Sequence, residues 1–557
     1  MQTFTPKLFT TLRDGYSSKT FQADAIAGLT VAIVALPLAM ALGIASGASP
    51  DKGLITAVIA GFLISALGGS RVQVGGPTGA FVVVVFNVIA THGYDGLLIA
   101  TLMAGIILII AGVFKLGQMI KFIPHPVVTG FTAGIAVIIA SSQVKDFLGL
   151  SLKSVPADFW PKWQAYFGVL SSTQLTTVCV GVGALCTIIM LRKFAPRLPG
   201  FLIAVLLSSV VVSVLNLPVD TVGSRFPDMP SGLPLPSLPN LSIAKIQEVL
   251  PSAFTIAFLA GIEALLSAVV ADGMIGTRHR SNQELIGQGV ANIASALFDG
   301  LPATGAIART ATNIKAGAKT PIAGILHAVF LLLFILFAAK LMAYVPMAAL
   351  AAILFIVAWG MSEYERFIAL LSMPNSDRGV LLLTFGLTVF VDLTVAIGVG
   401  VTVASLIFMA RMSEAVQIEN GDDINSDMNL DDEDISQRDA LPNGVEVFRI
   451  TGPFFFGVAG ELLDALRRVG QTPKVIILRM RLVPLLDASG VSGVSEFVTQ
   501  AKLASAQVIF SGVQSQPKEM LARGHIDEEL LGVHFAENYT EAVAKAQMLT
   551  HASEKIA

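Results

Sequence analysis

Residues 72–85 read VQVGGPTGAFVVVV, where two glycines, a proline and a threonine interrupt an otherwise apolar run. A second stretch, LPATGAIARTATN over residues 301–313, repeats this chemistry. Aligning the two Thr-Gly-Ala triplets, which begin at residues 78 and 304, gives an offset of 226 residues. The same offset carries the first apolar segment, which begins near residue 24, to residue 250, where another apolar segment begins. The sequence therefore predicts two repeats, each with one interrupted stretch.

The composition is that of a polytopic α-helical membrane protein. The 557 residues are 54% hydrophobic and 13% charged, whereas soluble domains carry about 25% charged residues. Many apolar runs are near 20 residues long, which is enough to cross a bilayer core of ~30 Å. We predict 14 segments, seven in each repeat, near residues 24–45, 53–68, 77–91, 96–114, 124–144, 173–191, 199–216, 251–271, 283–298, 304–314, 321–339, 343–361, 378–393 and 394–410.

An odd number of segments in each repeat gives the two repeats opposite orientations in the membrane. The connections on the predicted amino-terminal side carry 15 Lys and Arg residues, and those on the other side carry seven. Cytoplasmic connections usually hold the excess of Lys and Arg. We therefore predict that the amino and carboxyl termini are both cytoplasmic.

Changes in composition divide the chain into parts. Eight acidic residues fall within 421–440, which is typical of a solvated linker. Beyond it, strand-like runs at 444–450, 474–480 and 506–512 alternate with helical spacing, as in residues 460–470, and indicate an α/β domain. The predicted parts are a cytoplasmic segment over 1–23, a transporter domain over 24–411 with repeats at 24–216 and 251–411, a linker over 412–440, the α/β domain over 441–549 and a tail over 550–557.

The two interrupted stretches predict an anion site. Backbone at membrane depth must be hydrogen-bonded or line a cavity, and a half-helix that starts there presents free N–H groups and the positive end of its dipole. Paired interrupted segments in two inverted halves point to a transporter site. The alternative is two ordinary Gly/Pro kinks in packed helices. We expect an anion to bind between Thr78, Gly79, Ala80 and Phe81 of one stretch and Thr304, Gly305, Ala306 and Ile307 of the other.

Charged residues within the apolar segments are further candidates. Glu263 lies in the middle of a predicted span, where an ionised acid costs ~2.5–3.5 kcal/mol, so we expect it to load and release a coupling proton. Ser267, four residues on, shares its helix face and could bind substrate or an ion. The alternative for Glu263 is a structural hydrogen bond to a neighbouring helix start. Arg309 could add positive potential, pair with Glu263 or form a packing ion pair, and Asp392 is expected to have a structural or gate role.

Four stretches together resemble the sulfate permease (SulP) family of anion transporters. They are SPDKGLITAVIAGFLISALGGSR at 49–71, GGPTGAF at 75–81, ADGMIGTRHRSNQELIGQG at 271–289 and ARTATNIKAGAKTP at 308–321. The first departs from the family at Lys52 and Ile55, where tyrosines are usual. The resemblance implies two inverted seven-span repeats like those of uracil permease, with spans 1–4 and 8–11 as a core domain and spans 5–7 and 12–14 as a gate domain. It also implies a homodimer in the bacterial inner membrane and a carboxyl-terminal STAS domain.

Two departures from the family bear on mechanism. Members that couple bicarbonate to sodium typically have Asp and Thr where this chain has Glu263 and Ser267, and a Thr where Ile307 stands. Loss of that hydroxyl weakens a sodium site and favours coupling to protons. In LLDASG, residues 485–490, Ala488 stands at the position that is phosphorylated in similar anti-sigma-factor antagonists, so that switch is not expected.

The paired stretches predict a secondary active transporter of a small anion, and the family resemblance implies that this anion is sulfate, bicarbonate or a C4-dicarboxylate. The alternatives are a sodium-coupled bicarbonate transporter, an anion channel or motor, and a membrane sensor. We find no nucleophile–base arrangement, metal-ligand cluster or phosphate loop and expect neither enzymatic activity nor a cofactor, with H⁺ or Na⁺ as coupling ion. The formal net charge of −3 gives no sign of nucleic-acid binding. Expected partners are the anion, membrane lipid, a second copy of the chain and a cytoplasmic regulatory protein at the STAS domain.

Overall fold

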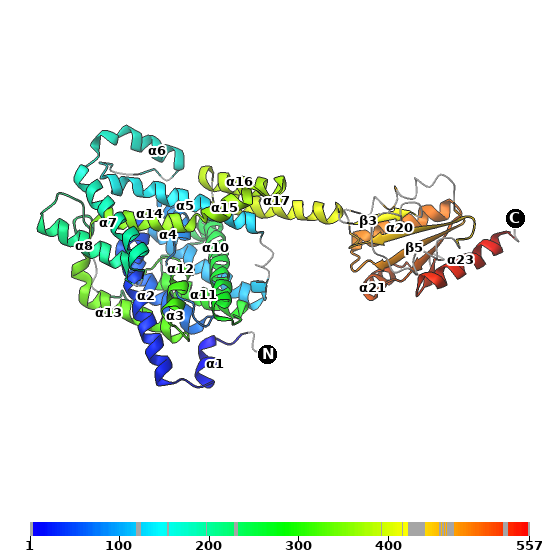
Figure 1. Ribbon diagram of the computed structural model, residues 1–557, viewed down its shortest axis with the longest axis horizontal. Helices are drawn as coiled ribbons and strands as arrows, with labels where there is room; N and C mark the ends of the chain where they lie inside the picture. The colour runs from blue at the N-terminus through cyan, green and yellow to red at the C-terminus, as the bar shows by residue number, and fades with distance from the viewer. Residues whose placement is uncertain are drawn as a thin grey trace. The chain divides into compact units, whose positions relative to one another are not determined.

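The computed structural model describes the chain apart from residues 1–3, 119–123, 153–154, 157, 197, 228–231, 392, 415, 421–440, 456–457, 459–461, 463, 465–472, 527–532 and 555–557. It contains two compact units, residues 1–404 and 405–557. The first is almost entirely helical, and the second is built around a sheet (Figure 1).

Each predicted span corresponds to a helix or to part of one. In the first half they are α2 (Ser18–Ala45), α3 (Pro50–Leu67), α4 (Gly79–Val113), α5 (His125–Leu148), α7 (Leu175–Phe194) and α8 (Gly200–Val214). In the second half they are α10 (Ile243–Ile275), α11 (Ser281–Leu297), α12 (Ile307–Lys315), α13 (Ile322–Met342), α14 (Met347–Met361), α16 (Asn375–Phe390) and α17 (Leu393–Glu414). α4 supplies two spans, because Gly93, with φ 72°, breaks it into two consecutive helices. The prediction of seven segments in each half is confirmed.

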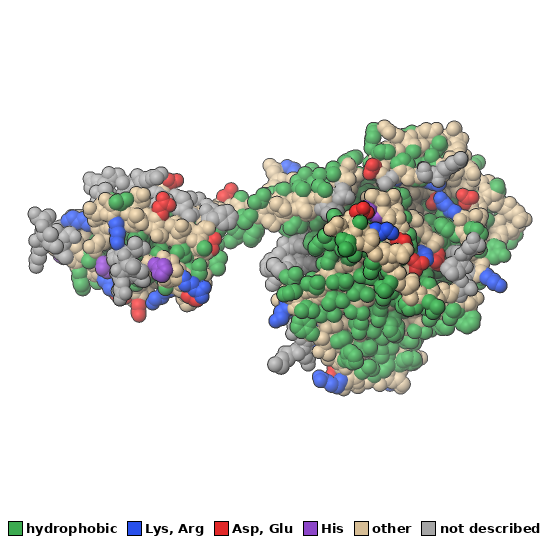
Figure 2. Space-filling view, turned by 180° about the vertical axis from the view of Figure 1, so that it is seen from behind, with side chains coloured by type: hydrophobic (Ala, Val, Ile, Leu, Met, Phe, Trp, Pro, Cys, Tyr) green, Lys and Arg blue, Asp and Glu red, His purple; other side chains and the backbone are tan. Residues whose placement is uncertain are grey.

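Four short helices lie outside the predicted spans. They are α1 (Lys7–Arg13), α6 (Phe159–Gly168), α9 (Val222–Arg225) and α15 (Tyr364–Leu371). Among the described residues, eight helices are long and apolar enough to cross a membrane. Figure 2 shows hydrophobic side chains gathered over a broad face of this unit, and Leu206 and Val210 of α8 are among its exposed large apolar residues. Such a surface suits contact with lipid.

The two halves are interleaved within the unit. α4 packs against α10 and α11, and α13 packs against α2 and α3, so the first four spans of each half form one group of helices. A second group forms where α5 packs against α14 and α16, and α7 packs against α8 and α14. These groups are the core and gate domains that the family resemblance implied.

Glycine allows a close approach of two helix backbones inside the core domain. α3 starts with Pro50 at its first position, a residue that favours helix starts, and its Gly53 lies against the backbone of α2. A Cβ atom on Gly53 would stand 2.0 Å from the carbonyl oxygen of Ala39, a backbone atom that cannot rotate away.

We therefore expect Gly53→Ala to separate α2 from α3 and to lower the stability of the protein by about 1–3 kcal/mol, the usual cost of overpacking. Gly360→Ala is the matched control, because Gly360 is exposed on α14 and no atom lies within 4 Å of its added Cβ. Thermal unfolding in detergent measures both variants. Equal melting temperatures for the two would contradict the packing that we describe.

The second unit is a five-stranded sheet covered by helices. Its strands are β3 (Gln417–Asn420), β4 (Val445–Thr451), β5 (Val475–Leu482), β6 (Gln507–Ser511) and β7 (His534–Ala536), in the spatial order β3-β4-β5-β6-β7. β3 pairs antiparallel with β4, and the other neighbours are parallel. The described helices are α20 (Ala488–Leu503), α21 (Ser515–Arg523) and α23 (Tyr539–Glu554). Phe448, Phe497 and Phe510 lie in the larger of its two apolar cores.

The stretch expected as a linker over 412–440 needs a correction at its start. α17 continues to Glu414, and residues 417–420 form the edge strand β3. The physical reason is that Val416 and Ile418 are apolar and pack into the core of the sheet. The acidic run 421–440 lies outside the described residues, as does most of the helix expected over 460–470. At the other end, α23 extends into the predicted tail.

Candidate functional site

The two interrupted stretches meet in the core domain. β1 (Gly75–Gly76) and β2 (Thr304–Gly305) pair antiparallel, with Gly75 opposite Gly305 and Gly76 opposite Thr304. Directly after these strands, α4 starts at Gly79 and α12 starts at Ile307. The structure thus brings together the two half-helix starts that the sequence singled out.

Glycines make this crossing possible. Gly76 has φ 146°, and a Cβ atom there would stand 2.4 Å from Nη1 of Arg309. A Cβ atom on Gly305 would stand 1.4 Å from Nε2 of Gln73, whose side chain lies across the strand. Glycine thus suits the backbone conformation at Gly76, and a side chain at either position would displace Arg309 or Gln73 from its place at the crossing.

Arg309 places a buried positive charge at this crossing. It lies in the first turn of α12, and its guanidinium donates to the carbonyl oxygens of Gly75, at 3.4 Å, and Pro77. Both carbonyls belong to the first stretch, so Arg309 joins the two repeats. No ion pair between Arg309 and Glu263 is present among the described residues. The pairing of these two residues, one of the roles that the sequence suggested for Arg309, is therefore not formed.

Glu263 lies beside the other half-helix start. It is half-buried on α10, and its Oε2 accepts a hydrogen bond of 2.7 Å from Oγ1 of Thr78, the residue that precedes α4. This contact is the hydrogen bond to a neighbouring helix start that the sequence offered as the alternative. It also places the carboxylate next to the expected anion position.

Ser267 lies deeper in the same region. It is fully buried, and its hydroxyl lies 3.2 Å from Oγ1 of Thr310, which also accepts from the backbone N–H of Val74 at 3.1 Å. Ser267 therefore supports the strand crossing. Thr304 has a comparable position, since its hydroxyl donates to the carbonyl of Ala260 at 2.8 Å.

The remaining predicted anion contacts differ in their exposure. Ala80, Phe81, Gly305 and Ala306 are buried, whereas Ile307 is 39% exposed. Gly79 faces the gate domain: a Cβ atom on it would stand 2.5 Å from Sδ of Met361 and 3.3 Å from Cδ1 of Ile139. Asp392, the residue expected at the gate, lies outside the described residues.

The sequence reasoning missed three polar residues that tie the two repeats together. Nε2 of Gln73 donates to the carbonyl of Ala264 at 3.2 Å, Thr310 joins α10 to the first stretch, and buried Glu284 accepts from the N–H groups of Gly69 and Ser70 at 2.7 and 3.0 Å. All three lie in stretches quoted above, and their polarity within those stretches was the signal that could have identified them. Their partners lie about 190 to 236 positions away in sequence, which local patterns do not reveal.

Comparison with known proteins agrees with this architecture. The profile described as "Sulfate permease family" matches residues 21–384, and that described as "STAS domain" matches residues 440–542. The "Putative sulfate transporter YvdB" of Bacillus subtilis is 41% identical over 530 residues, which cover 95% of this chain and 98% of that protein. The "Bicarbonate transporter BicA" of a Picosynechococcus species is 32% identical over 525 residues, 91% of each chain.

Solved structures give the same result for the fold. The transmembrane domain of a cyanobacterial bicarbonate transporter BicA superposes with a TM-score of 0.62 at 32% identity, covering 70% of this chain and 98% of that one. Murine Slc26a9, an anion transporter solved in an inward-facing state, superposes with a TM-score of 0.85 over 98% of this chain and 94% of its own, at 16% identity. From the matched profile, the similar relatives and the two interleaved repeats, the chain belongs to the sulfate permease family.

Proposed function

We propose that this protein is a secondary active transporter that carries a small anion across the bacterial inner membrane. The observation that carries the proposal is the pairing of β1 with β2, which brings two half-helix starts and the buried guanidinium of Arg309 to one place. The names of the similar relatives, sulfate and bicarbonate transporters, favour a small oxyanion. A C4-dicarboxylate is the further candidate.

The chemistry of the site suits an anion. The first turns of α4 and α12 hold backbone N–H groups without intrahelical acceptors, and both helix dipoles are positive at these ends. Arg309 adds a full charge in surroundings with little water. An anion bound here is recognised mainly through backbone groups, which tolerate several oxyanions and leave the choice among them to the size of the space.

We propose Glu263 as the coupling group. Its carboxylate lies on a helix of the core domain, bonded to Thr78 at the start of α4, so a proton on Glu263 and an anion at the half-helix starts would move together. Movement of the core domain relative to the gate domain would expose both to one side of the membrane and then to the other. Ile307 offers no hydroxyl to a sodium ion, which supports protons over sodium.

The remaining parts of the proposal concern assembly. We propose that both termini are cytoplasmic, that two copies form a dimer, and that the STAS domain binds a cytoplasmic regulatory protein. Deletion of residues 441–557 is then expected to modulate transport without abolishing it.

Uptake by proteoliposomes tests the proposed function. Labelled bicarbonate, sulfate and succinate are offered under an imposed pH gradient, first without sodium and then with it. We expect one inorganic oxyanion to accumulate without sodium. Accumulation only with sodium would indicate that the coupling ion is sodium, bound at Glu263 and Ser267, and not a proton. Single-channel currents in a planar bilayer would indicate that the protein is a channel and not a transporter.

A further inference from the structure

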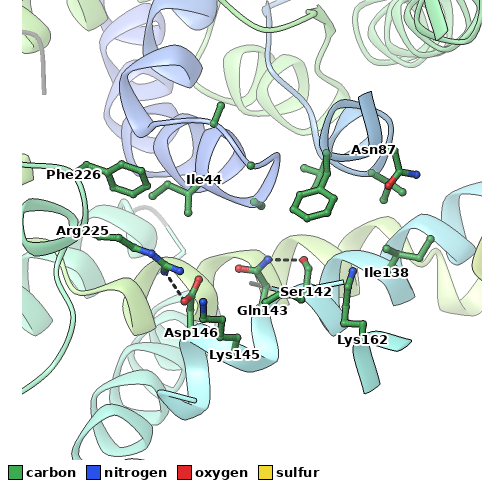
Figure 3. A pocket seen from close by; sticks show the side chains of 17 residues that line it. Ile44, Asn87, Ile138, Ser142, Gln143, Lys145, Asp146, Lys162, Arg225 and Phe226 are labelled. Carbon is green, nitrogen blue, oxygen red and sulfur yellow. Dashed lines mark hydrogen bonds and ion pairs between the residues drawn. The ribbon is translucent and has the colours of Figure 1, made fainter. Parts of the chain in front are cut away.

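A cavity of about 270 Å³ opens between the core domain and the gate domain. It lies at the carboxyl-terminal end of α2, which Ile44 marks in Figure 3. Core residues such as Ala48, Val83 and Asn87 line one wall. Ser142 and Lys145 of α5, together with Lys162 of α6, line the opposite wall.

The charges around this cavity are unbalanced. Among the described residues that line it, Lys145, Lys162 and Arg225 stand beside a single acid, Asp146. Asp146 forms an ion pair with Arg225, in which Nη1 of Arg225 lies 2.7 Å from Oδ1 of Asp146. No ion pair of the described residues includes either lysine. The walls therefore carry an excess of positive charge.

Lys162 is the most unusual of these groups. Its side chain is only 3% exposed and points into the gap between the two walls (Figure 3), where its ammonium lies 5.7 Å from the centre of the Phe86 ring. Burial lowers the pKa of Lys162, and the nearby charge of Asp158 opposes this only in part. A buried ammonium that forms no ion pair is unfavourable, and an anion in the cavity would supply a partner for it.

The cavity also leads towards the half-helix site. Val82 and Val83, which line it, lie about one helical turn from Gly79 at the start of α4. Beyond them, Met361 and Ile139 of the gate domain close over Gly79. The residues that line the cavity thus reach to within about one helical turn of the expected transport position.

We propose that this cavity is a second anion site, in which Lys162 holds a small oxyanion before it passes to the half-helix starts. The inference rests on the proposed function, because it places the site on the path of the transported anion. It assigns to α6, a helix outside the membrane-spanning segments, a part in capturing substrate from one side only.

The test compares the two membrane faces. Anion exchange is measured in right-side-out and inside-out vesicles with sulfate or bicarbonate, whichever the wild type carries. In Lys162→Met we expect the half-saturating concentration to rise about tenfold on the face that bears Lys162, the effect of losing one charge-assisted hydrogen bond, and to stay unchanged on the other face. Lys162→Arg is expected to restore the wild-type value. Lys245→Met is the control, because Lys245 lies in the first turn of α10 and does not line the cavity.

A second variant covers the case in which Lys162→Met does not fold. Asn87→Asp adds a negative charge to the opposite wall, and we expect it to weaken binding on the same face, while Asn87→Gln does not. An unchanged half-saturating concentration in Lys162→Met, or an equal rise on both faces, would overturn the inference and leave the proposed function standing. A wild type that carries no anion would instead refute the proposed function.

Discussion

Replacement of Arg309 by methionine is expected to reduce anion uptake by about a hundredfold or more. The guanidinium is a buried positive charge at the crossing of β1 and β2, where it donates to the carbonyl oxygens of Gly75 and Pro77. Removal of one partner from a desolvated charge contact costs about 2–5 kcal/mol. The initial rate of uptake by proteoliposomes, measured over a range of anion concentrations, separates loss of affinity from loss of turnover.

Arg309 also supports the fold, since it donates to the carbonyls of Gly75 and Pro77. The melting temperature of each variant is therefore measured beside its uptake. Arg309→Lys keeps the charge and is expected to keep part of the activity. Arg366→Met is the matched control, because Arg366 is an exposed arginine paired with Glu363 on α15. Wild-type uptake by a well-folded Arg309→Met protein would show that Arg309 does not contribute to the anion site.

Replacement of Glu263 by glutamine is expected to abolish accumulation driven by a pH gradient while anion exchange continues. Glutamine has nearly the shape of glutamate, and its carbonyl oxygen can still accept the hydrogen bond from Thr78. It cannot exchange a proton, so the anion site is preserved and only the coupling is lost. Concentrative uptake and counterflow of labelled anion, measured on the same proteoliposomes, distinguish the two processes.

Thr78→Ser and Thr78→Val separate coupling from structure. The serine variant keeps the hydroxyl that bonds Glu263 and is expected to resemble the wild type. The valine variant leaves the carboxylate without this donor, and we expect it to change the pH dependence of uptake. If Glu263→Gln accumulates anion as well as the wild type does, Glu263 only supports the start of α4 and the coupling proton is carried elsewhere.

The architecture could be predicted because its signals are local and repeated. Apolar runs of the right length marked the spans, and two Thr-Gly-Ala triplets at a constant offset revealed the repeats before any contact was known. The same reasoning identified Glu263 and Arg309, because a charged residue in an apolar run is costly and conspicuous.

The contacts within the site could not be predicted in the same way. Whether Arg309 reaches Glu263 depends on the register of β1 against β2 and on the rotation of α10, and neither leaves a periodic trace in the sequence. The structure turns Arg309 towards the carbonyls of Gly75 and Pro77 and leaves Glu263 with Thr78. The role of Lys162 could not be predicted for a different reason. It lies in a connecting segment where a lysine is ordinary, and only its burial makes it unusual.

The pairing of β1 with β2 has a consequence for the direction of transport. Backbone hydrogen bonds tie the two half-helix starts together, so in the proposed cycle they travel as one rigid piece. An anion then meets the same amide groups and the same guanidinium whichever compartment the site faces. The intrinsic affinity of the half-helix site is therefore expected to be equal from both sides, and any difference between the two faces would come from the cavity around Lys162. Net flow is set by the gradients that the cell maintains, and the protein would release its anion as readily as it takes it up once those gradients are reversed.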